Sequence, residues 1–293
     1  MKLYRYKGLD GEYVPQDVTH AIVDDSVTVV KKKAFYGCYD LVSVIMGGNI
    51  NTIEKHAFAY CRALQLIRLS KALENVGDGS FFRCESLEAL FLPSTIKSIG
   101  HQAFRYCQSL RLLMLANGVN KLLILPNGVS VRMVGSAIIC NTRIRDIAIL
   151  SGVRVSDDHD VSRESSSRVN EWLIHHMDEA PFQKLCYDSF ITAKDINNYL
   201  IENVNESALA IDSYHRMTPL HMLSMNPNAP ADAIASLLNA NIETSVYLDA
   251  TNRTPLDFAR AYNVDGLVAM ISVLCLHKNS TMPGSVQAKN ENE

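Results

Sequence analysis

Four cysteines recur at a fixed interval, and their thiols are the first groups in the sequence that could do chemistry. They stand 23 residues apart, at Cys38, Cys61, Cys84 and Cys107. Thiolates bind zinc or form disulfides, and side chains of one column in a stacked fold would lie about 4.8 Å apart. However, no histidine or carboxylate column accompanies them, and free cysteine behaves as a small buried hydrophobe. We therefore expect small buried side chains at tight turns rather than a metal or disulfide ladder.

The histidines are the next candidates for chemistry. His175 and His176 precede Asp178 and Glu179, but neighbouring residues of a helix point about 100° apart, so the two imidazoles would not share a face. His221 has no nucleophile or acid partner within its own motif. The sequence also lacks the patterns G-x-x-x-x-G-K-[ST], G-x-G-x-x-G and H-E-x-x-H. It therefore predicts a non-enzymatic protein with no catalytic, cofactor-binding or metal-binding residues.

The cysteines belong to a larger repeat that must position them. Seven columns of residues recur with the same period, among them Phe35, Phe58, Phe81 and Phe104, then Leu41, Leu64, Leu87 and Leu110, and Val30, Ile53, Val76 and Ile99. In Leu87–Leu92 the apolar residues alternate before Pro93, which indicates a short strand with one buried face. One such unit cannot bury its apolar side alone. Stacked units must therefore share one elongated interior, with their strands aligned in a parallel sheet.

Two of these units carry a family resemblance. Ile53–Cys61 and Ile99–Cys107 resemble the BspA-like leucine-rich repeat, whose pattern reads I-x-x-I-G-x-x-A-F-x-x-C-x-x-L-x-x-I-x-L-P. The resemblance covers roughly residues 17 to 125. It implies a right-handed α/β leucine-rich-repeat solenoid with a parallel β-sheet on its concave face. It also implies adhesion or protein binding rather than catalysis.

The repeat pattern is lost after Val119, because Asn127 and Ser130 stand where the next Phe and Cys would fall. We therefore expect degenerate, capping coils over 122–150, and a cap over 1–20 at the other end, since terminal repeats must hide the open core. The solenoid with its caps is predicted to span residues 1–150.

Two outward columns of the concave sheet form the candidate partner-binding face. Alternation along the strands places the following side chains away from the core: Ser43, Leu66, Ala89 and Leu112 in one column, and Ile45, Arg68, Phe91 and Met114 in the next. Most are apolar, and an exposed apolar stripe often marks a contact surface. The alternative is that another segment of the same chain covers the stripe. The Lys31–Lys33 run, expected on the opposite, helical side, is interpreted as a solvated edge.

A second repeat follows in the C-terminal half. Thr218–Leu223 recurs as Thr254–Ala259, with a weaker copy at Ala180–Leu185. Thr suits a helix N-cap, and Pro suits the first helical position, where no amide donor is needed. Apolar residues at helical spacing follow each copy, so we expect helices over 195–202, 231–239 and 266–274.

The T-P-L-H block of this second repeat resembles the ankyrin repeat, over roughly residues 170 to 276. The resemblance implies an all-α helical repeat array over 169–276 and a structural, hydrogen-bonding role for His221. The usual glycines after the helices are missing, and Asn226–Pro230 replaces the short turn between them. The combination of the two repeats resembles two-part proteins that are abundant in some unicellular algae and related protists.

The remaining segments and the composition set the context. Residues 151–168 are polar and serine-rich, which predicts a linker, and residues 277–293 are predicted to be a disordered tail. The net charge of -3 disfavours nucleic-acid binding. Neither a signal peptide nor a membrane span is evident, and the seven cysteines form no CxxC pair, so we expect an intracellular, cytoplasmic protein. Trp172 is expected to be a packing anchor between the two arrays.

These observations favour a scaffold that binds a protein partner through its repeat surfaces, with no cofactor, nucleic acid or membrane involved. The alternative is a self-associating structural or adhesion-type protein, in which the apolar stripe or an open solenoid end mediates contact between identical chains.

Overall fold

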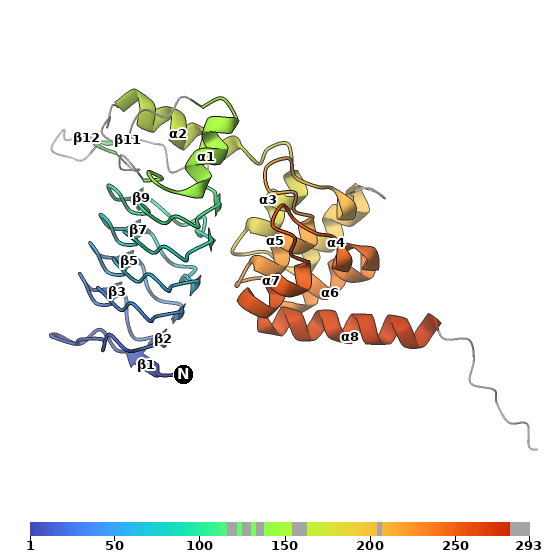
Figure 1. Ribbon diagram of the computed structural model, residues 1–293, viewed down its shortest axis with the longest axis horizontal. Coiled ribbons are helices and arrows are strands. Elements are labelled where there is room, and N and C mark those ends of the chain that lie inside the picture. Colours follow the sequence, from blue (N-terminus) through green and yellow to red (C-terminus); the bar gives the residue numbers. More distant parts are fainter. Residues whose placement is uncertain (116–121, 125–129, 133–137, 154–162, 204–206, 282–293) are drawn as a thin grey trace, which may run out of the picture.

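The chain folds into two parts that lie side by side, a β-solenoid and a group of helices (Figure 1). The computed structural model describes residues 1–115, 122–124, 130–132, 138–153, 163–203 and 207–281.

Parallel strands one coil apart line the face of the solenoid that is turned toward the helices. One sheet holds β1 (Leu3–Tyr6), β2 (His20–Val23), β4 (Ser43–Met46) and β6 (Leu66–Arg68). The pair β8 (Ala89–Leu90) and β10 (Leu112–Leu113) continues the same face. Paired residues such as Ser43 and Leu66 stand one 23-residue period apart. The parallel stacking predicted from the residue columns is therefore confirmed.

The rest of each coil is not helical, contrary to our expectation for the side that carries Lys31–Lys33. A second parallel ladder joins the short strands β3 (Val29–Val30), β5 (Thr52–Ile53), β7 (Asn75–Val76) and β9 (Ser98–Ile99), and turns follow them. Lys33, His56 and Gln102 occupy one repeat position, and each has a left-handed φ between 55° and 60°. A left-handed residue in every coil prevents a continuous helix.

A stack of phenylalanine rings forms the centre of the solenoid. The ring centroids of Phe35 and Phe58 are 4.8 Å apart, those of Phe58 and Phe81 5.3 Å, and those of Phe81 and Phe104 5.8 Å. All four side chains are fully buried. Offset stacking of this kind adds about 0.5–1.5 kcal/mol per pair beyond the burial of apolar area. The shared interior predicted from this column is therefore confirmed.

Both ends of the solenoid are closed by the chain itself. At the start, β1 pairs with β2, and Tyr6 packs at 5.2 Å on Phe35. At the far end, the antiparallel strands β11 (Leu122–Ile124) and β12 (Ser130–Arg132) replace the degenerate coils that we expected over 122–150. The helix α1 (Arg143–Leu150) follows them.

The helix α2 (Arg163–His175) also belongs to the solenoid, which differs from the predicted boundary at residue 169. Val169, Leu173 and Ile174 pack in the same apolar cluster as the phenylalanine stack. α1 and α2 lie across the end of the solenoid in Figure 1. Most of the predicted linker, 154–162, lies outside the described residues.

The C-terminal part is helical. It contains α3 (Pro181–Tyr187), α4 (Ala193–Glu202), η1 (Ser207–Leu209), α5 (Pro219–Met225), α6 (Ala231–Ala240), η2 (Ile242–Val246), α7 (Pro255–Tyr262) and α8 (Val264–Thr281). The three helices predicted downstream of the repeat motif correspond to α4, α6 and α8. The last of these continues to Thr281, so residues 277–281 are helical rather than part of the predicted tail, and 282–293 lie outside the described residues.

The threonines of the two strong motif copies, Thr218 and Thr254, start helices as their motif predicts, whereas Ala180 of the weaker copy makes no side-chain cap. Thr192, which lies outside the motif, caps α4 in the same way. Thr192, Thr218 and Thr254 each accept a hydrogen bond from the third residue of the following helix, whose side chain bonds back to the threonine amide. Such reciprocal caps satisfy backbone donors that the first turn leaves open. The short helices α3, α5 and α7 stack in one row, and α4, α6 and α8 stack in a second row beside them.

Candidate interaction surface on the concave face

The helices cover half of the predicted partner-binding face. Ala89, Phe91, Leu112 and Met114 are all buried, and they share an apolar cluster with α3 and the helices behind it. The ring of Phe91 stacks on Tyr187 of α3 at a centroid distance of 4.8 Å. At these four residues another segment of the same chain covers the apolar stripe, as the alternative interpretation expected. We call them the covered face.

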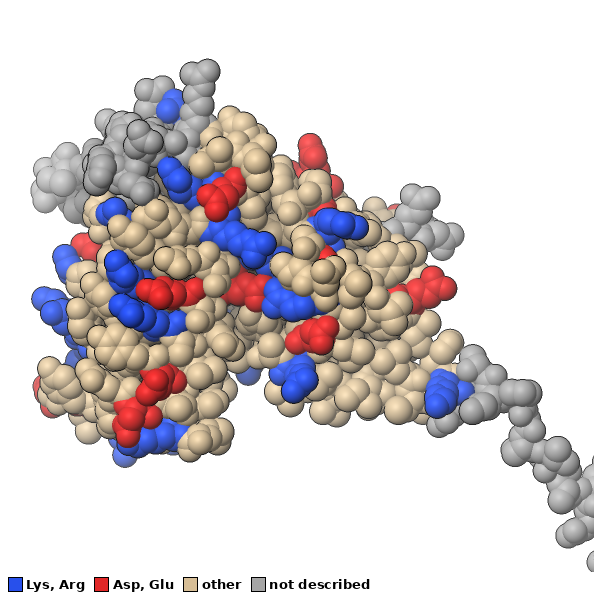
Figure 2. All heavy atoms as spheres, in the orientation of Figure 1, with Lys and Arg blue, Asp and Glu red and all other residues tan. Residues whose placement is uncertain are grey.

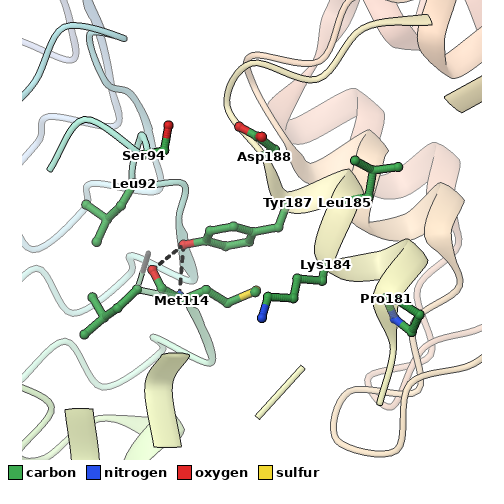
Figure 3. A pocket seen from close by; sticks show the side chains of 9 residues that line it. Leu92, Ser94, Met114, Pro181, Lys184, Leu185, Tyr187 and Asp188 are labelled. Carbon is green, nitrogen blue, oxygen red and sulfur yellow. Dashed lines mark hydrogen bonds between the residues drawn. The ribbon is translucent and has the colours of Figure 1, made fainter. Parts of the chain in front are cut away.

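Tyr187 also forms hydrogen bonds with the sheet, because its hydroxyl lies between two backbone groups that a regular parallel ladder would join directly. In a regular parallel pair the amide would donate to the carbonyl 24 positions earlier, as the amide of Gly47 donates to the carbonyl of Val23 at the end of the β2–β4 pair. The amide of Met114 would then donate to the carbonyl of Leu90. Instead, the Met114 amide donates to the Tyr187 hydroxyl at 3.0 Å, and that hydroxyl donates to the Leu90 carbonyl. Figure 3 shows Tyr187 reaching from α3 to Met114. The helical part is thus bonded into the backbone of the sheet.

Strand ends on the covered face find further partners outside the strand ladder. The hydroxyl of Ser189, just after α3, donates to the carbonyl of Phe91 at 3.3 Å. The amide of Leu115 donates to the carbonyl of Leu173 in α2 at 3.2 Å. Buried backbone groups need such partners because an unsatisfied one costs about as much as a lost hydrogen bond.

A network of charged side chains joins the two parts beside this apolar contact. The carboxylate of Glu88 accepts from the Arg111 guanidinium at 2.7 Å, from the Arg253 guanidinium at 2.9 Å and from the Tyr262 hydroxyl at 2.8 Å. Arg111 also donates to Asp249 at 2.9 Å, and its side chain is 3% exposed. Two cations and two anions thus balance one another where α7 and the loop before it meet the solenoid.

This network also holds its acids ionised. Although burial raises the pKa of Glu88, the hydrogen bonds and charges of Arg253 and Arg111 bring that pKa below its ordinary value. Burial also raises the pKa of Asp249, but hydrogen bonds from Arg253 and Thr251 outweigh burial and bring this pKa below its ordinary value. A ring nitrogen of His215 lies 2.9 Å from the carbonyl oxygen of Arg111, so a third segment of the helical part is bonded to the same strand.

The other half of the predicted face is open. Ile45 is 43% exposed, Arg68 is exposed, and Ser43 and Leu66 are half-buried. The strand register adds neighbours that the sequence analysis did not include, since Leu3, His20, Ser43 and Leu66 form one row across the sheet, and Arg5, Ile22, Ile45 and Arg68 form the next. We call these eight residues the open face. In Figure 2 the two parts touch along the upper part of the view and are separated by a notch below.

A cavity of about 350 Å³ lies at the edge of the covered face, where α3 meets the solenoid (Figure 3). Leu92, Met114, Pro181 and Leu185 supply much of its wall. Lys184 is bonded to Asp178 and to the carbonyl of Ile174, so its ammonium group is already paired. This arrangement offers an apolar recess and no nucleophile with an adjacent base.

The cysteine column has a structural geometry. Cys61, Cys84 and Cys107 are fully buried, and each thiol lies 3.1–3.2 Å from the carbonyl oxygen of the phenylalanine in the preceding coil. Burial raises the pKa of Cys38 to about 11 and those of Cys61 and Cys84 well above the ordinary value. Protonated thiols are poor ligands and nucleophiles. The expectation of small buried side chains is therefore confirmed for this column.

The histidines and the tryptophan also have packing roles. His221 lies 2.8 Å from the hydroxyl of Thr218 and 3.1 Å from the carbonyl of Arg253, so it links α5 to the start of α7. Trp172 stacks on His176 at 4.3 Å and meets Tyr214 of the helical part edge-on at 6.2 Å. Trp172 therefore lies between the two parts, as predicted. Burial, together with the nearby His215, lowers the pKa of His176 to about 4.

Within the described ranges, His, Cys, Asp and Glu side chains form no group of three that could hold a metal ion. Among the described helices, none combines the length and the apolar character needed to cross a bilayer.

The chain is similar to known leucine-rich-repeat proteins. Residues 13–123 match the family model "BspA type Leucine rich repeat region" in six copies. A crystal structure of a leucine-rich-repeat protein from T. pallidum is 27% identical, covers 47% of this chain and 58% of its own, and has a TM-score of 0.36. This chain therefore spans less than two thirds of the length of that protein.

Two further solved structures are similar to part of the chain. The pneumococcal vaccine antigen PcpA is 22% identical, with 38% of this chain and 28% of that chain covered and a TM-score of 0.36. A leucine-rich-repeat protein from Bacteroides ovatus is 19% identical, with 49% and 45% covered and a TM-score of 0.33. None of the curated proteins matches the chain. Over residues 13–123 the chain is thus similar to BspA-type leucine-rich repeats, in agreement with the stacked parallel coils of the solenoid.

Proposed function

We propose that this protein is a non-enzymatic interaction module that binds a protein partner on the open face. The observation that carries the proposal is the difference in burial along one column. Ile45 is exposed, whereas Phe91 and Met114 further along the column are buried by the helices. Leucine-rich-repeat proteins commonly bind on the concave sheet, and the open face is the part of that sheet left accessible.

The chemistry of the open face suggests the kind of partner. The register places Ile22 and Ile45 side by side, with Arg5 next to Ile22 and Arg68 next to Ile45. An apolar centre with a guanidinium at each end suits a segment that carries an apolar side chain flanked by carboxylates. Arg5 already donates to Asp24 at 3.2 Å, so Arg68 is the better candidate to bind an incoming carboxylate.

The helical part contributes to this function as a fixed wall. Because Tyr187 and the Glu88 network bond it to the solenoid, it limits the accessible sheet to the strands β1, β2, β4 and β6. A partner segment is therefore expected to lie across these strands, in the notch beside the helices.

A peptide selection tests the proposal with a defined probe. The full chain is used to select a phage-displayed random peptide library, and an enriched peptide is titrated by fluorescence anisotropy. Ile45→Asp and Arg68→Glu should each weaken binding at least about tenfold, which corresponds to about 1.4 kcal/mol. Leu9→Asp, a matched change at a 61% exposed apolar residue in the loop after β1, should leave binding unchanged.

The result is clear in either direction. Peptides that bind the Ile45→Asp protein as tightly as the unmodified one place the binding surface elsewhere and refute the proposal. A cooperative thermal transition near that of the unmodified protein shows that each variant is folded.

We also propose that α3 to α8 form an ankyrin-like array. Three features support this interpretation: the reciprocal threonine caps, the two rows of stacked helices, and the His221 link between consecutive units. A variant that lacks residues 255–281 should keep the remaining helices folded, because repeat units contact mainly their neighbours. Complete loss of helical circular dichroism in that variant would argue against a modular array.

An intracellular, cytoplasmic setting is part of the same proposal. Cys38, Cys61, Cys84, Cys107, Cys186 and Cys275 are free thiols in the structure, which suits a reducing compartment. Cys275 is exposed and provides a reporter. A membrane-impermeant maleimide should not label it on intact cells that make the protein, and labelling there would exclude this setting.

A further inference from the structure

A second cavity, of about 400 Å³, lies beside the charged network, where α7 meets the solenoid. Three of the residues that line it, Glu88, Arg253 and Tyr262, already bond to one another. In Figure 2, acidic and basic side chains gather along the line where the two parts of the molecule meet. This cavity differs from the apolar recess at α3, because most of the side chains that line it are polar. We call it the polar cavity.

Four other side chains of the wall have polar groups without a protein partner. Gln65, Ser86, Ser109 and Arg143 line the cavity, and these side chains form no hydrogen bond or ion pair with any residue that the structure describes. Together they supply a guanidinium group, two hydroxyls and a carboxamide, all of which can donate hydrogen bonds. A cavity with this lining suits a ligand that accepts several hydrogen bonds at once.

Backbone hydrogen bonds hold these side chains around the cavity. Ser86 and Ser109 stand one period apart, and the amide of Ser109 donates to the carbonyl of the residue before Ser86 at 3.2 Å, so the two serines stack in neighbouring coils. The amide of Ile144 donates to the carbonyl of Leu110 at 2.7 Å. This bond attaches the start of α1 to the coil that carries Ser109, and it thereby brings Arg143 to the cavity.

The charges around the cavity leave one cation without a counterion. The two acids of the charged network balance its two arginines. Arg143 is the remaining cation of the wall. The acid of the same helix, Asp146, neither lines the cavity nor forms an ion pair with Arg143. A single negative charge would therefore neutralise the wall, whereas the carboxylate of Glu88 would repel a ligand with two.

We propose that the polar cavity binds the carboxylate of an acidic side chain of the partner protein. A carboxylate carries one negative charge and has about four acceptor sites, so it can accept from the guanidinium fork of Arg143 and from the hydroxyls of Ser86 and Ser109 together. This inference rests on the proposed function, because the occupant belongs to the partner that lies on the open face.

The position of the cavity next to the open face supports this occupant. Gln65 directly precedes Leu66, a residue of the open face, and Arg68 stands at the other end of the same strand, β6. Gln65 and Arg68 are three residues apart, which is about 10 Å along a strand. One partner segment with two acidic residues can therefore reach Arg68 and the polar cavity together. The cavity supplies the second carboxylate site that an apolar segment flanked by acids requires.

Nuclear magnetic resonance of the full chain tests the cavity with small defined probes. Acetylated, amidated glutamate should shift the amide resonances of Ser86 and Ser109 in a saturable way. The dissociation constant should lie in the millimolar range, because a single amino acid makes few contacts. The neutral glutamine analogue should bind at least about tenfold more weakly, because a guanidinium group binds an ionised acceptor more strongly than a neutral one.

Two substitutions at Arg143 test its role against a matched control. Arg143→Gln should weaken binding of the glutamate probe at least about tenfold. Arg143→Lys should have an intermediate effect, because lysine keeps the charge and loses the fork. Arg260→Gln is the control, since Arg260 is exposed on α7 and does not line the cavity, and it should bind the probe normally. A cooperative thermal transition near that of the unmodified protein shows that each variant is folded.

Three results would overturn the proposal. The first is an equal affinity for the glutamate and glutamine probes. The second is equal weakening by R143Q and R260Q, which would reduce the effect to the net charge of the protein. The third is tighter binding of acetylated, amidated phosphoserine, whose second negative charge the wall should repel.

The peptide selected on the open face separates this inference from the proposed function. Ile45→Asp should weaken binding of that peptide and leave binding of the glutamate probe unchanged, because Ile45 does not line the cavity. Arg143→Gln should weaken the peptide about fivefold, and changing the peptide's acidic residue to glutamine should remove this effect, as expected for two groups in contact. Unchanged peptide affinity in the Arg143→Gln protein would exclude a partner side chain from the cavity. Unchanged affinity in the Ile45→Asp protein would refute the open face alone.

Discussion

The two halves of the concave face are built from the same repeat and have different roles. Ile45 and Phe91 occupy the same position two coils apart, yet Ile45 is 43% exposed and Phe91 is 3% exposed. The solenoid geometry is the same at both positions. The difference comes from Tyr187 and its neighbours, which bury Phe91 and leave Ile45 accessible. A repeat therefore specifies where a surface points, while the second part of the chain decides which stretch of that surface stays available.

The largest expected difference between the halves is in packing energy. Phe91→Ala should lower the free energy of unfolding by about 3–5 kcal/mol, because it removes a large buried side chain and its stack on Tyr187. Ile45→Ala, in the same column on the open face, should change it by less than about 1 kcal/mol. Urea denaturation followed by circular dichroism measures both. Equal effects would mean that the helices do not cover the sheet as described.

The charged network should show the next largest effect. Glu88→Gln leaves Arg111 and Arg253 with a neutral partner. This change should lower the free energy of unfolding by about 2–3 kcal/mol, as expected for hydrogen bonds to charged groups. The pKa of Glu88 is lowered in the folded protein, so its contribution is fully present above the ordinary value of 4.5 and is lost as the pH falls toward the folded pKa.

A titration of stability against pH isolates this contribution. The unmodified protein should lose stability below pH 4.5 more steeply than the Glu88→Gln protein. Glu74→Gln is a suitable control, because Glu74 pairs with Lys97 at a half-exposed site on the solenoid alone. Parallel pH profiles for the unmodified and Glu88→Gln proteins would show that Glu88 does not bond the two parts together.

The sequence predicted the solenoid well because its information is periodic. Phe35, Phe58, Phe81 and Phe104 stack since equal spacing along the chain becomes equal position in successive coils. The second ladder was missed because two-residue strands such as Val29–Val30 are too short to show alternation. The pattern identified their column as buried and gave no sign of strand pairing.

The covered face could not be predicted, because its determinants do not repeat. Glu88 and Arg111 stand one period apart, so an ion pair between neighbouring coils was open to inference. Their partner Arg253 lies 165 residues from Glu88 in the sequence. Tyr187 is one tyrosine in a short helix, with no local signal that its hydroxyl enters the sheet. Such contacts depend on how the two parts dock, which periodicity does not encode.

The hydroxyl of Tyr187 should have a moderate effect. Tyr187→Phe keeps the ring on Phe91 but leaves the Met114 amide and the Leu90 carbonyl without their partner, at a cost of about 1–2 kcal/mol. Hydrogen exchange should show faster exchange at the Met114 amide in particular. Tyr199→Phe is the control, since Tyr199 stacks on Phe182 within the helical part, 4.2 Å between centroids. If the two substitutions lower the free energy of unfolding equally, the Tyr187 hydroxyl does not bridge the two strands of the ladder.

The smallest expected effect marks the border between the halves. Leu66 is half-buried at the edge of the apolar cluster shared with the helices, so Leu66→Ala should cost about 1 kcal/mol, well below a fully buried leucine. Ser43, its partner in the preceding coil, makes the control Ser43→Ala, which should be neutral within about 0.5 kcal/mol. A cost at Leu66 as large as that at Phe91 would extend the covered face by one coil. The surface left for a partner would then end at β4, and Arg68 would lose its place in the binding site.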